Sequence, residues 1–116
     1  MKKYSEIIQG LPGYSREDII QILRPALAEL EAEEDFRVKE VTVIGSRTRN
    51  QAKPDSDLDI LVEYEGTMRE DDAFNALNAE PIYIEGIQID INPIRREESG
   101  TTQEWLDRSR KYLESI

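Results

Sequence analysis

Residues 57–60 read Asp-Leu-Asp-Ile, and this run determines how the rest of the chain is interpreted. Successive side chains of a strand point to opposite faces, so Asp57 and Asp59 share one face while Leu58 and Ile60 share the other. Two unpaired carboxylates on one face repel each other. A divalent cation removes that conflict, and hard oxygen ligands suit Mg²⁺. The pattern therefore predicts a strand with one core face and one metal-binding face.

A third aspartate, Asp90, stands in a similar apolar frame, the run Ile-Asp-Ile at 89–91. In a strand it shares a face with Gln88 and Asn92. If that strand pairs beside residues 57–61, three carboxylates meet at one end of a sheet and can hold one or two Mg²⁺ ions. The alternative is that these acids are solvated residues on the wet face of an amphipathic sheet, although Asp is disfavoured in strands.

Upstream of the acid pair, Gly45 and Ser46 follow one predicted strand and open a predicted short helix. Gly allows a sharp turn, and a Ser hydroxyl with the amide groups of a helix N-terminus can hold a phosphate. An ordinary helix cap explains the same two residues. Arg47 and Arg49 either neutralise a triphosphate or balance an acidic surface, and Ser56 could simply cap the turn before the strand. Phosphate donors beside a metal-bridging pair indicate phosphoryl or nucleotidyl transfer.

The composition narrows the class of protein. The chain has 116 residues, 38% of them hydrophobic and 34% charged, which predicts one globular domain over 1–116. Its net charge of −10 argues against strong nucleic-acid binding and against an anionic membrane surface. It contains no Cys and no His, so acid–base chemistry falls to carboxylates, Lys, Tyr or water. With no signal peptide and no long apolar run, we expect a cytoplasmic protein.

Apolar periodicity and turn residues predict an αβ(α)βαββα order, an α/β (α+β) chain with a small mixed sheet flanked by helices. Pro25 should kink or split the first helix, because it lacks an N–H and clashes with the preceding turn. The helices are expected after the Ser15 cap, over 46–52, over 69–79 and after the capping box at 101–104. The strands are expected over 38–44, 58–64, 82–84 and 87–91.

The combined motifs resemble the DNA polymerase beta-like nucleotidyltransferase superfamily. They are a hydrophobic-Gly-Ser run at 44–46, Asp-hydrophobic-Asp-hydrophobic at 57–60 and hydrophobic-Asp-hydrophobic at 89–91. Residues 44–50 and 56–62 are most similar to the small stand-alone members, the minimal nucleotidyltransferases, which include the MNT antitoxins of HEPN–MNT toxin–antitoxin pairs.

The resemblance covers about 19–94 more loosely, and it is weakest from Gly66 to Glu85. One departure is Asn50, where many relatives carry Gly. Asn tolerates a positive φ, so the turn can survive the replacement.

The resemblance implies a palm-like sheet core, an NTP substrate and two Mg²⁺ ions, for which Mn²⁺ can substitute. It places Gly45 and Ser46 at the triphosphate, and it makes Asp57 and Asp59 metal ligands. Asp90 would be the third carboxylate, which ligates the catalytic metal and helps to activate the incoming hydroxyl.

Arg49 matches a basic position frequent in the small members, and with Ser56 it completes the expected nucleotide-binding set. The implied reaction moves an NMP, expected to be AMP from ATP, onto a hydroxyl. The acceptor would be a tyrosine of a partner HEPN-type toxin or a small aminoglycoside-like alcohol. We expect the contact surface to be the rim of the metal site, with residues 69–72 and the C-terminal helix as candidates. The alternative is a non-catalytic binding module of the same fold that acts as an antitoxin by covering its partner.

Overall fold

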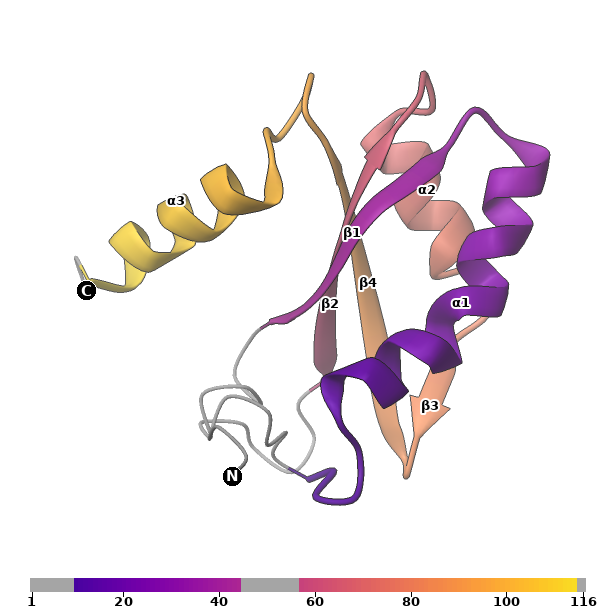
Figure 1. The fold of residues 1–116 in the computed structure, drawn as a ribbon, viewed down its shortest axis with the longest axis vertical. Coiled ribbons are helices and arrows are strands. Elements are labelled where there is room, and N and C mark those ends of the chain that lie inside the picture. The colour runs from indigo at the N-terminus through magenta and orange to yellow at the C-terminus, as the bar shows by residue number, and fades with distance from the viewer. Residues whose placement is uncertain (1–9, 45–56, 115–116) are drawn as a thin grey trace.

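The computed structural model describes residues 10–44 and 57–114, with side chains to residue 108. Three helices and four strands form a mixed α/β fold, as expected (Figure 1). In chain order these are α1 (Arg16–Glu33), β1 (Arg37–Ile44), β2 (Leu58–Glu65), α2 (Glu70–Leu77), β3 (Ile82–Ile84), β4 (Ile87–Arg95) and α3 (Thr102–Glu114). The short helix expected over 46–52 lies outside the described residues.

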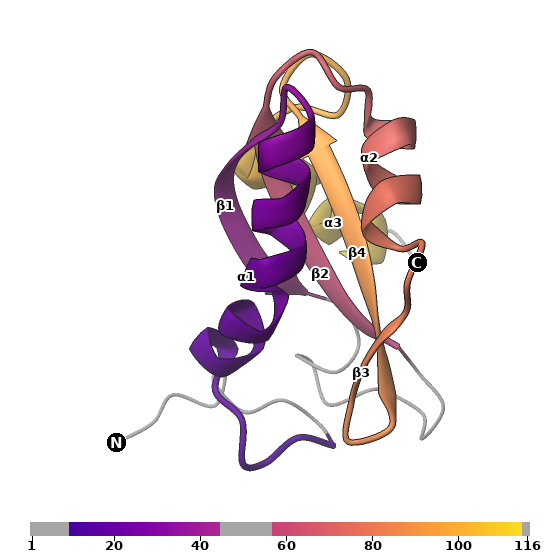
Figure 2. The same cartoon turned by 90° about the vertical axis from the view of Figure 1, so that its right-hand side faces the viewer.

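The sheet has the order β1-β2-β4-β3, and only the central β2–β4 pair is parallel. Helices α1 and α2 cover one face, while α3 extends from the opposite face (Figures 1 and 2). None of the described helices has the length and apolar character needed to cross a membrane.

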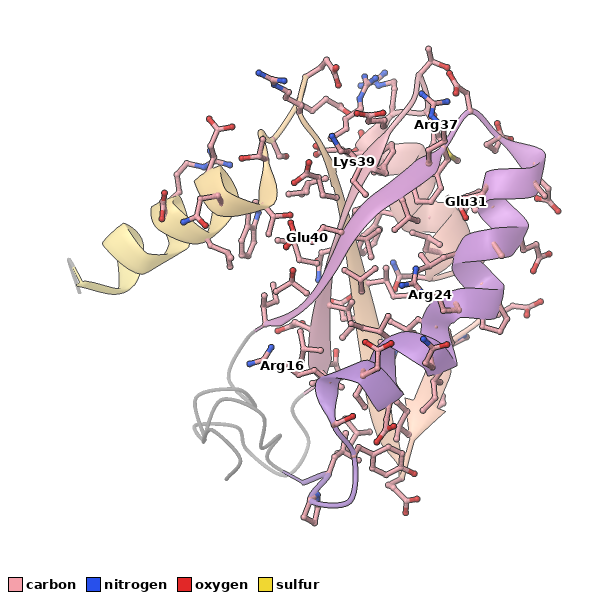
Figure 3. All side chains as sticks on the ribbon, in the orientation of Figure 1. Arg16, Arg24, Glu31, Arg37, Lys39 and Glu40 are labelled. Atoms are coloured by element: carbon pink, nitrogen blue, oxygen red, sulfur yellow. The ribbon has the colours of Figure 1, made fainter. Side chains whose placement is uncertain are left out.

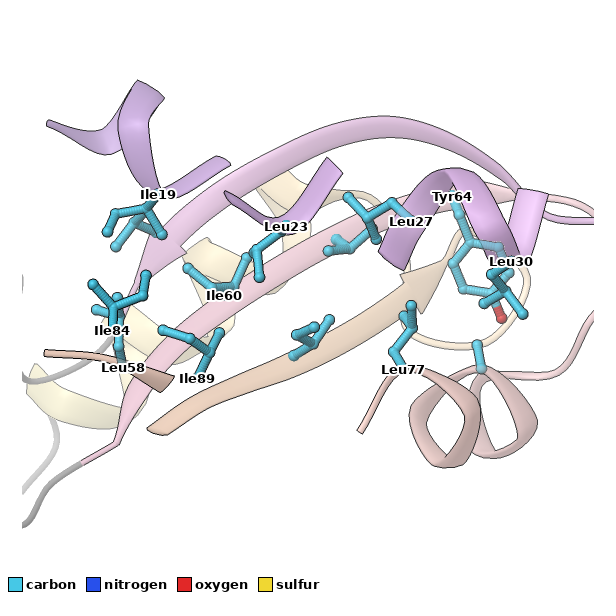
Figure 4. Packing of buried hydrophobic residues seen from close by; sticks show 14 of the residues in the cluster. Ile19, Leu23, Leu27, Leu30, Leu58, Ile60, Tyr64, Leu77, Ile84 and Ile89 are labelled. Carbon is cyan, nitrogen blue, oxygen red and sulfur yellow. The ribbon is translucent and has the colours of Figure 1, made fainter. Parts of the chain in front are cut away.

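The hydrophobic core lies between the sheet and the helices α1 and α2. Alternate residues of β2 point into it, and α1 contributes one buried residue at nearly every turn (Figure 4). Burying one such Leu or Ile side chain contributes roughly 1.5–3 kcal/mol. The principal contributors are Ile19, Leu23, Leu27, Leu30, Leu58, Ile60, Val62 and Tyr64. Because β2 must present this face to the core, Asp59 has to face the other way.

Helix α1 begins at the predicted cap. The Asp18 N–H donates to Ser15 Oγ at 3.1 Å and the Ser15 N–H donates to Asp18 Oδ2 at 2.9 Å, which forms a complete capping box. The helix continues through Pro25. Figures 1 and 2 show a bend along α1 and no break, so of the two expected outcomes the kink is the one the structure has.

Strand β4 is longer than expected and continues through Pro93 to Arg95. Beyond Ile89 no strand of the described residues pairs with it on its β3 side, where the missing N–H of a proline is tolerated. Asn78, which caps α2, takes the place of a strand there. Its Nδ2 donates to Ile91 O at 2.9 Å, and the Ile91 N–H donates to its Oδ1 at 3.0 Å.

The far end of β2 is locked to the loop between α1 and β1. Asp35 accepts hydrogen bonds from the Thr67 N–H at 3.0 Å and from its hydroxyl at 2.9 Å. Gly66 approaches this loop so closely that a Cβ on it would lie 1.9 Å from Asp35 O, and its φ is +136°. Only glycine fits both requirements.

Helix α3 begins at the second predicted capping box, in which the Glu104 N–H donates to Thr101 Oγ1 at 3.2 Å. The Thr101 N–H donates in return to Glu104 Oε1 at 3.1 Å. Thr102, the first residue of α3, is held to the sheet because its N–H donates to Glu63 Oε1 at 2.7 Å. The Glu63 carboxylate therefore anchors the first turn of α3 to β2.

Candidate active site on the second face of the sheet

The parallel pairing of β2 and β4 brings two of the three predicted acids together. Asp59 and Asp90 are direct partners in the register, and adjacent strands lie roughly 4.8 Å apart. Both residues are half-buried and both face away from the core. On its other side Asp59 pairs with Ile44, the last residue of β1. The acid pair is thus bordered by the strand end that leads to Gly45.

The alternation of each strand explains this placement. Ile89 and Ile91 of β4 are buried in the core, so Asp90 and Asn92 must point to the second face. The Nδ2 of Asn92 reaches Asp90 O at 3.2 Å and Ile60 O at 3.4 Å. It therefore bridges the two strands beside the acid pair, a contact that sequence reasoning missed.

The third predicted acid, Asp57, immediately precedes β2 and is exposed. Within residues 10–44 and 57–114, no group of three or more Asp or Glu side chains is arranged to hold a metal ion. The structure thus places Asp59 beside Asp90 and Asp57 on the approach to them. A centre in which all three acids share a metal remains a prediction.

The predicted nucleotide-binding residues Gly45, Ser46, Arg49 and Ser56 lie outside the described residues. The described residues that flank them are Ile44 and Asp57, and both stand at the same end of the sheet as the acid pair. Their role at a triphosphate remains a prediction.

Arg16 is a cation beside the end of β1 that the sequence reasoning did not single out. Its guanidinium Nη1 donates to Val43 O at 2.7 Å. Figure 3 shows the Arg16 side chain near the end of β1. It is the first residue of α1, where the helix dipole disfavours positive charge. The sequence signal that could have identified Arg16 is a cation placed directly after a helix N-cap.

Glu63 lies on the same face of β2, four residues beyond Asp59, and has a different environment. Its side chain is only 9% exposed and accepts the Thr102 N–H at the start of α3. This acid therefore serves to attach a helix.

Residues 69–72, expected at the rim of the site, lie at the other end of the sheet. The Glu70 carboxylate accepts the N–H of Arg95, the last residue of β4, at 2.9 Å. The reason is the direction of β2, which carries the chain about 20 Å from Asp59 before α2 begins. The expectation that residues 69–72 lie at the rim is therefore wrong, and the C-terminal helix as a contact surface stays a prediction.

Residues 22–112 match the nucleotidyltransferase domain family. With a match of this extent, the chain belongs to that family, which confirms the resemblance drawn from the motifs. A curated relative is Protein adenylyltransferase MntA of Thermococcus cleftensis, 49% identical over 49 residues, and it agrees with the minimal nucleotidyltransferase group. The matched stretch is 42% of this chain and 48% of the relative, so the chain spans about half the length of the curated relative it matches. No solved structure matches the chain significantly.

Proposed function

We propose that this protein transfers AMP from ATP to a hydroxyl group. The acceptor oxygen forms a bond to the α-phosphorus, the bond from that phosphorus to the bridging oxygen breaks, and pyrophosphate leaves. The hydroxyl proton passes to a carboxylate of the site or to water. The observation that carries the proposal is the register pairing of Asp59 with Asp90 on the second face of the sheet. It supports the reaction because the chain belongs to the nucleotidyltransferase domain family.

The acid pair fits a divalent cation such as Mg²⁺, or Mn²⁺ in its place. Asp59 and Asp90 offer hard oxygen donors from adjacent strands, and Asp57 stands two residues before Asp59. Mg²⁺ keeps several waters and takes substrate phosphates as ligands, so few protein carboxylates suffice. When bound, two such ions would lower the pKa of the acceptor hydroxyl and offset charge on the leaving pyrophosphate.

The remaining residues would position the nucleotide. Gly45, Ser46, Arg49 and Ser56 are proposed to contact the triphosphate, because the strand ends on either side of their segment border the acid pair. Arg16 adds positive charge at the same end of the sheet. Fixed donors and cations that are already in place lower the barrier without reorganising during the reaction.

The acceptor is proposed to be a tyrosine on a partner protein, specifically a HEPN-type toxin, which would make this chain an antitoxin. The relative's printed name, a protein adenylyltransferase, supports a protein acceptor. The net charge of −10 favours encounter with a basic partner. Because the reaction consumes ATP, we place the protein in the cytoplasm.

The experiment combines the protein, labelled ATP and Mg²⁺ with the product of its neighbouring gene, and it reads out intact masses. Addition of AMP to a tyrosine of that product supports the proposal in full. Transfer only to an aminoglycoside-like alcohol keeps the reaction and overturns the protein acceptor. Binding of ATP and metal with transfer to neither would identify a non-catalytic binding module of this fold.

A further inference from the structure

A groove lies between α1 and α2, on the side of the sheet opposite the acid pair. Its volume is about 380 Å³. Buried Leu30 and Leu77 form part of its base, and Ala26 and Ala76 line its sides. Figure 2 shows the two helices on the same side of the sheet. Small side chains at facing positions leave space that larger residues would fill.

The charged residues at the rim of this groove are acidic. Glu29 and Glu33 line it from α1 and Glu80 lines it from the segment after α2, while none of the described residues that line it is a Lys or Arg. None of these three carboxylates makes a hydrogen bond or an ion pair with the part of the chain that the structure describes. Their charges therefore remain available to a ligand.

The acidic rim opposes the stability of α1. Glu29 and Glu33 stand four residues apart near the C-terminal end of the helix, whose last turn contains no basic residue. Like charges at this spacing repel, and the negative end of the helix dipole disfavours both. Folding alone gives no reason to place carboxylates there.

An exposed apolar side chain lies on α1 one turn before the groove. Ile22 is 40% exposed, which is unusual for so large a hydrophobic residue on this chain. It precedes Ala26, Glu29 and Glu33 by four, seven and eleven residues, so all four lie along one strip of the helix. The strip thus combines apolar contact area with unpaired negative charge.

We propose that this groove binds a peptide segment of another protein in which Lys or Arg residues alternate with apolar ones. The apolar residues would contact the base of the groove and Ile22, and the cations would pair with Glu29, Glu33 and Glu80. Because the groove and the Asp59–Asp90 pair are on opposite faces of the sheet, binding here leaves the acid pair accessible. The proposal does not depend on the catalytic assignment.

The test uses a labelled peptide in which Lys and Leu alternate and a matched peptide in which Glu replaces Lys. Fluorescence anisotropy gives the affinity, and ¹H–¹⁵N NMR shifts locate the bound peptide. We expect the Lys peptide alone to bind, with shifts confined to residues 22–33 and 76–82. Affinity should fall as salt rises, because screening weakens the exposed pairs.

Two variants separate the contribution of the rim carboxylates to binding from that of the groove's open volume. Glu29→Gln with Glu33→Gln should weaken binding by about tenfold or more and should raise Tm, because it also removes repulsion within α1. Ala76→Phe should weaken binding by filling the groove while it leaves the charges in place. The control, Glu17→Gln, removes an exposed charge from the first turn of the same helix and should leave the affinity unchanged.

Absence of binding by the Lys peptide would overturn the proposal, and so would three further results. The first is equal loss of affinity in the Glu17→Gln control, and the second is NMR shifts spread over the whole acidic surface. The third is a concentration-dependent dimer in sedimentation that Ala76→Phe abolishes, because the groove would then bind a second copy of this chain. Failure of peptide binding leaves the transferase assay unaffected, so the two proposals fail independently.

Discussion

The two ends of β2 place acids on the same face of the sheet and use them differently. Near its start, Asp59 pairs in register with Asp90, whose carboxylate makes no hydrogen bond or ion pair within the described residues. Near its end, Glu63 is almost fully buried and accepts a backbone N–H from α3. A buried carboxylate with a donor is part of the structure. The Asp90 carboxylate has no such donor within the described residues, and this contrast separates candidate chemistry from architecture.

The largest expected effect comes from removing one acid of the pair. Asp59→Asn or Asp90→Asn should lower the rate of nucleotide transfer by at least about 100-fold, because a metal ligand is lost. For Asp90→Asn, Tm should stay equal or rise, because repulsion between the carboxylates is relieved. Transfer assays and thermal melts measure the two quantities. A variant that melts well below the unmodified chain and retains its activity would assign these acids to the structure instead.

At the other end of β2, Gly66→Ala should destabilise the fold by about 3 kcal/mol. The new Cβ would collide with the backbone of Asp35, so one of the two loops must move. Urea denaturation measures the change. Gly13→Ala is the matched control, because nothing lies within 4 Å of a Cβ placed there. Equal effects of the two substitutions would show that the close approach of Gly66 to Asp35 does not contribute to stability.

Glu63→Gln should lower the free energy of unfolding by about 1–2 kcal/mol and leave transfer unchanged, because the charged acceptor of the Thr102 N–H is weakened. Its control is Glu65→Gln, which removes an exposed ion pair with Lys39 worth roughly 0–1 kcal/mol. If Glu63→Gln abolished transfer in a fully folded protein, the division between the two ends of β2 would be wrong.

A smaller effect is expected at Arg16. Arg16→Met should raise KM for ATP several-fold and change kcat little, because a cation at the end of β1, beside the proposed triphosphate segment, is lost and the carboxylates remain. The control is Arg24→Met, which removes an exposed cation from the same helix. Steady-state kinetics of both variants measure the effect, and an equal rise in KM would indicate a general effect of net charge.

The smallest predicted effect is a pH dependence at Glu98. The Glu70 N–H first, and then the Arg95 guanidinium, hold the pKa of Glu98 below its ordinary value of 4.5. Because the folded-state pKa is lowered, this contribution is complete above the unfolded value and is lost as pH falls through the folded one. Melts from neutral pH to about pH 3 should show a shallower acid loss for Glu98→Gln than for the unmodified chain.

The order of elements was predictable because each depends on local signals. Ser15 with Asp18 caps α1, and the alternation around Asp59 and Asp90 determines which face each acid occupies. Sequence reasoning could not distinguish the role of Glu63 from that of Asp59, because the N–H that Glu63 accepts lies 39 residues away. Strand β4 was predicted too short because it contains Pro93. A proline is compatible with a strand at an unpaired edge, and the sequence does not reveal where that edge lies.

The sequence motifs predicted some residues of the candidate site and missed another. Asp59 and Asp90 were expected to meet, and the sheet pairs them. Arg16 was overlooked because its contact with Val43 joins a helix start to a strand end 27 residues away. Its position depends on how α1 packs across the sheet, which no local pattern determines.

The side-chain amide of Asn78 also affects how this molecule behaves in a crowded cell. A sheet edge with free N–H and C=O groups is a template on which another chain can add a strand. At Ile91 that position is occupied by Asn78, and two residues further Pro93 offers no N–H at all. The opposite edge, β1, has a register shift beside the charged Lys39. The part of β4 beyond β3 and the edge strand β1 therefore resist the strand addition that begins aggregation.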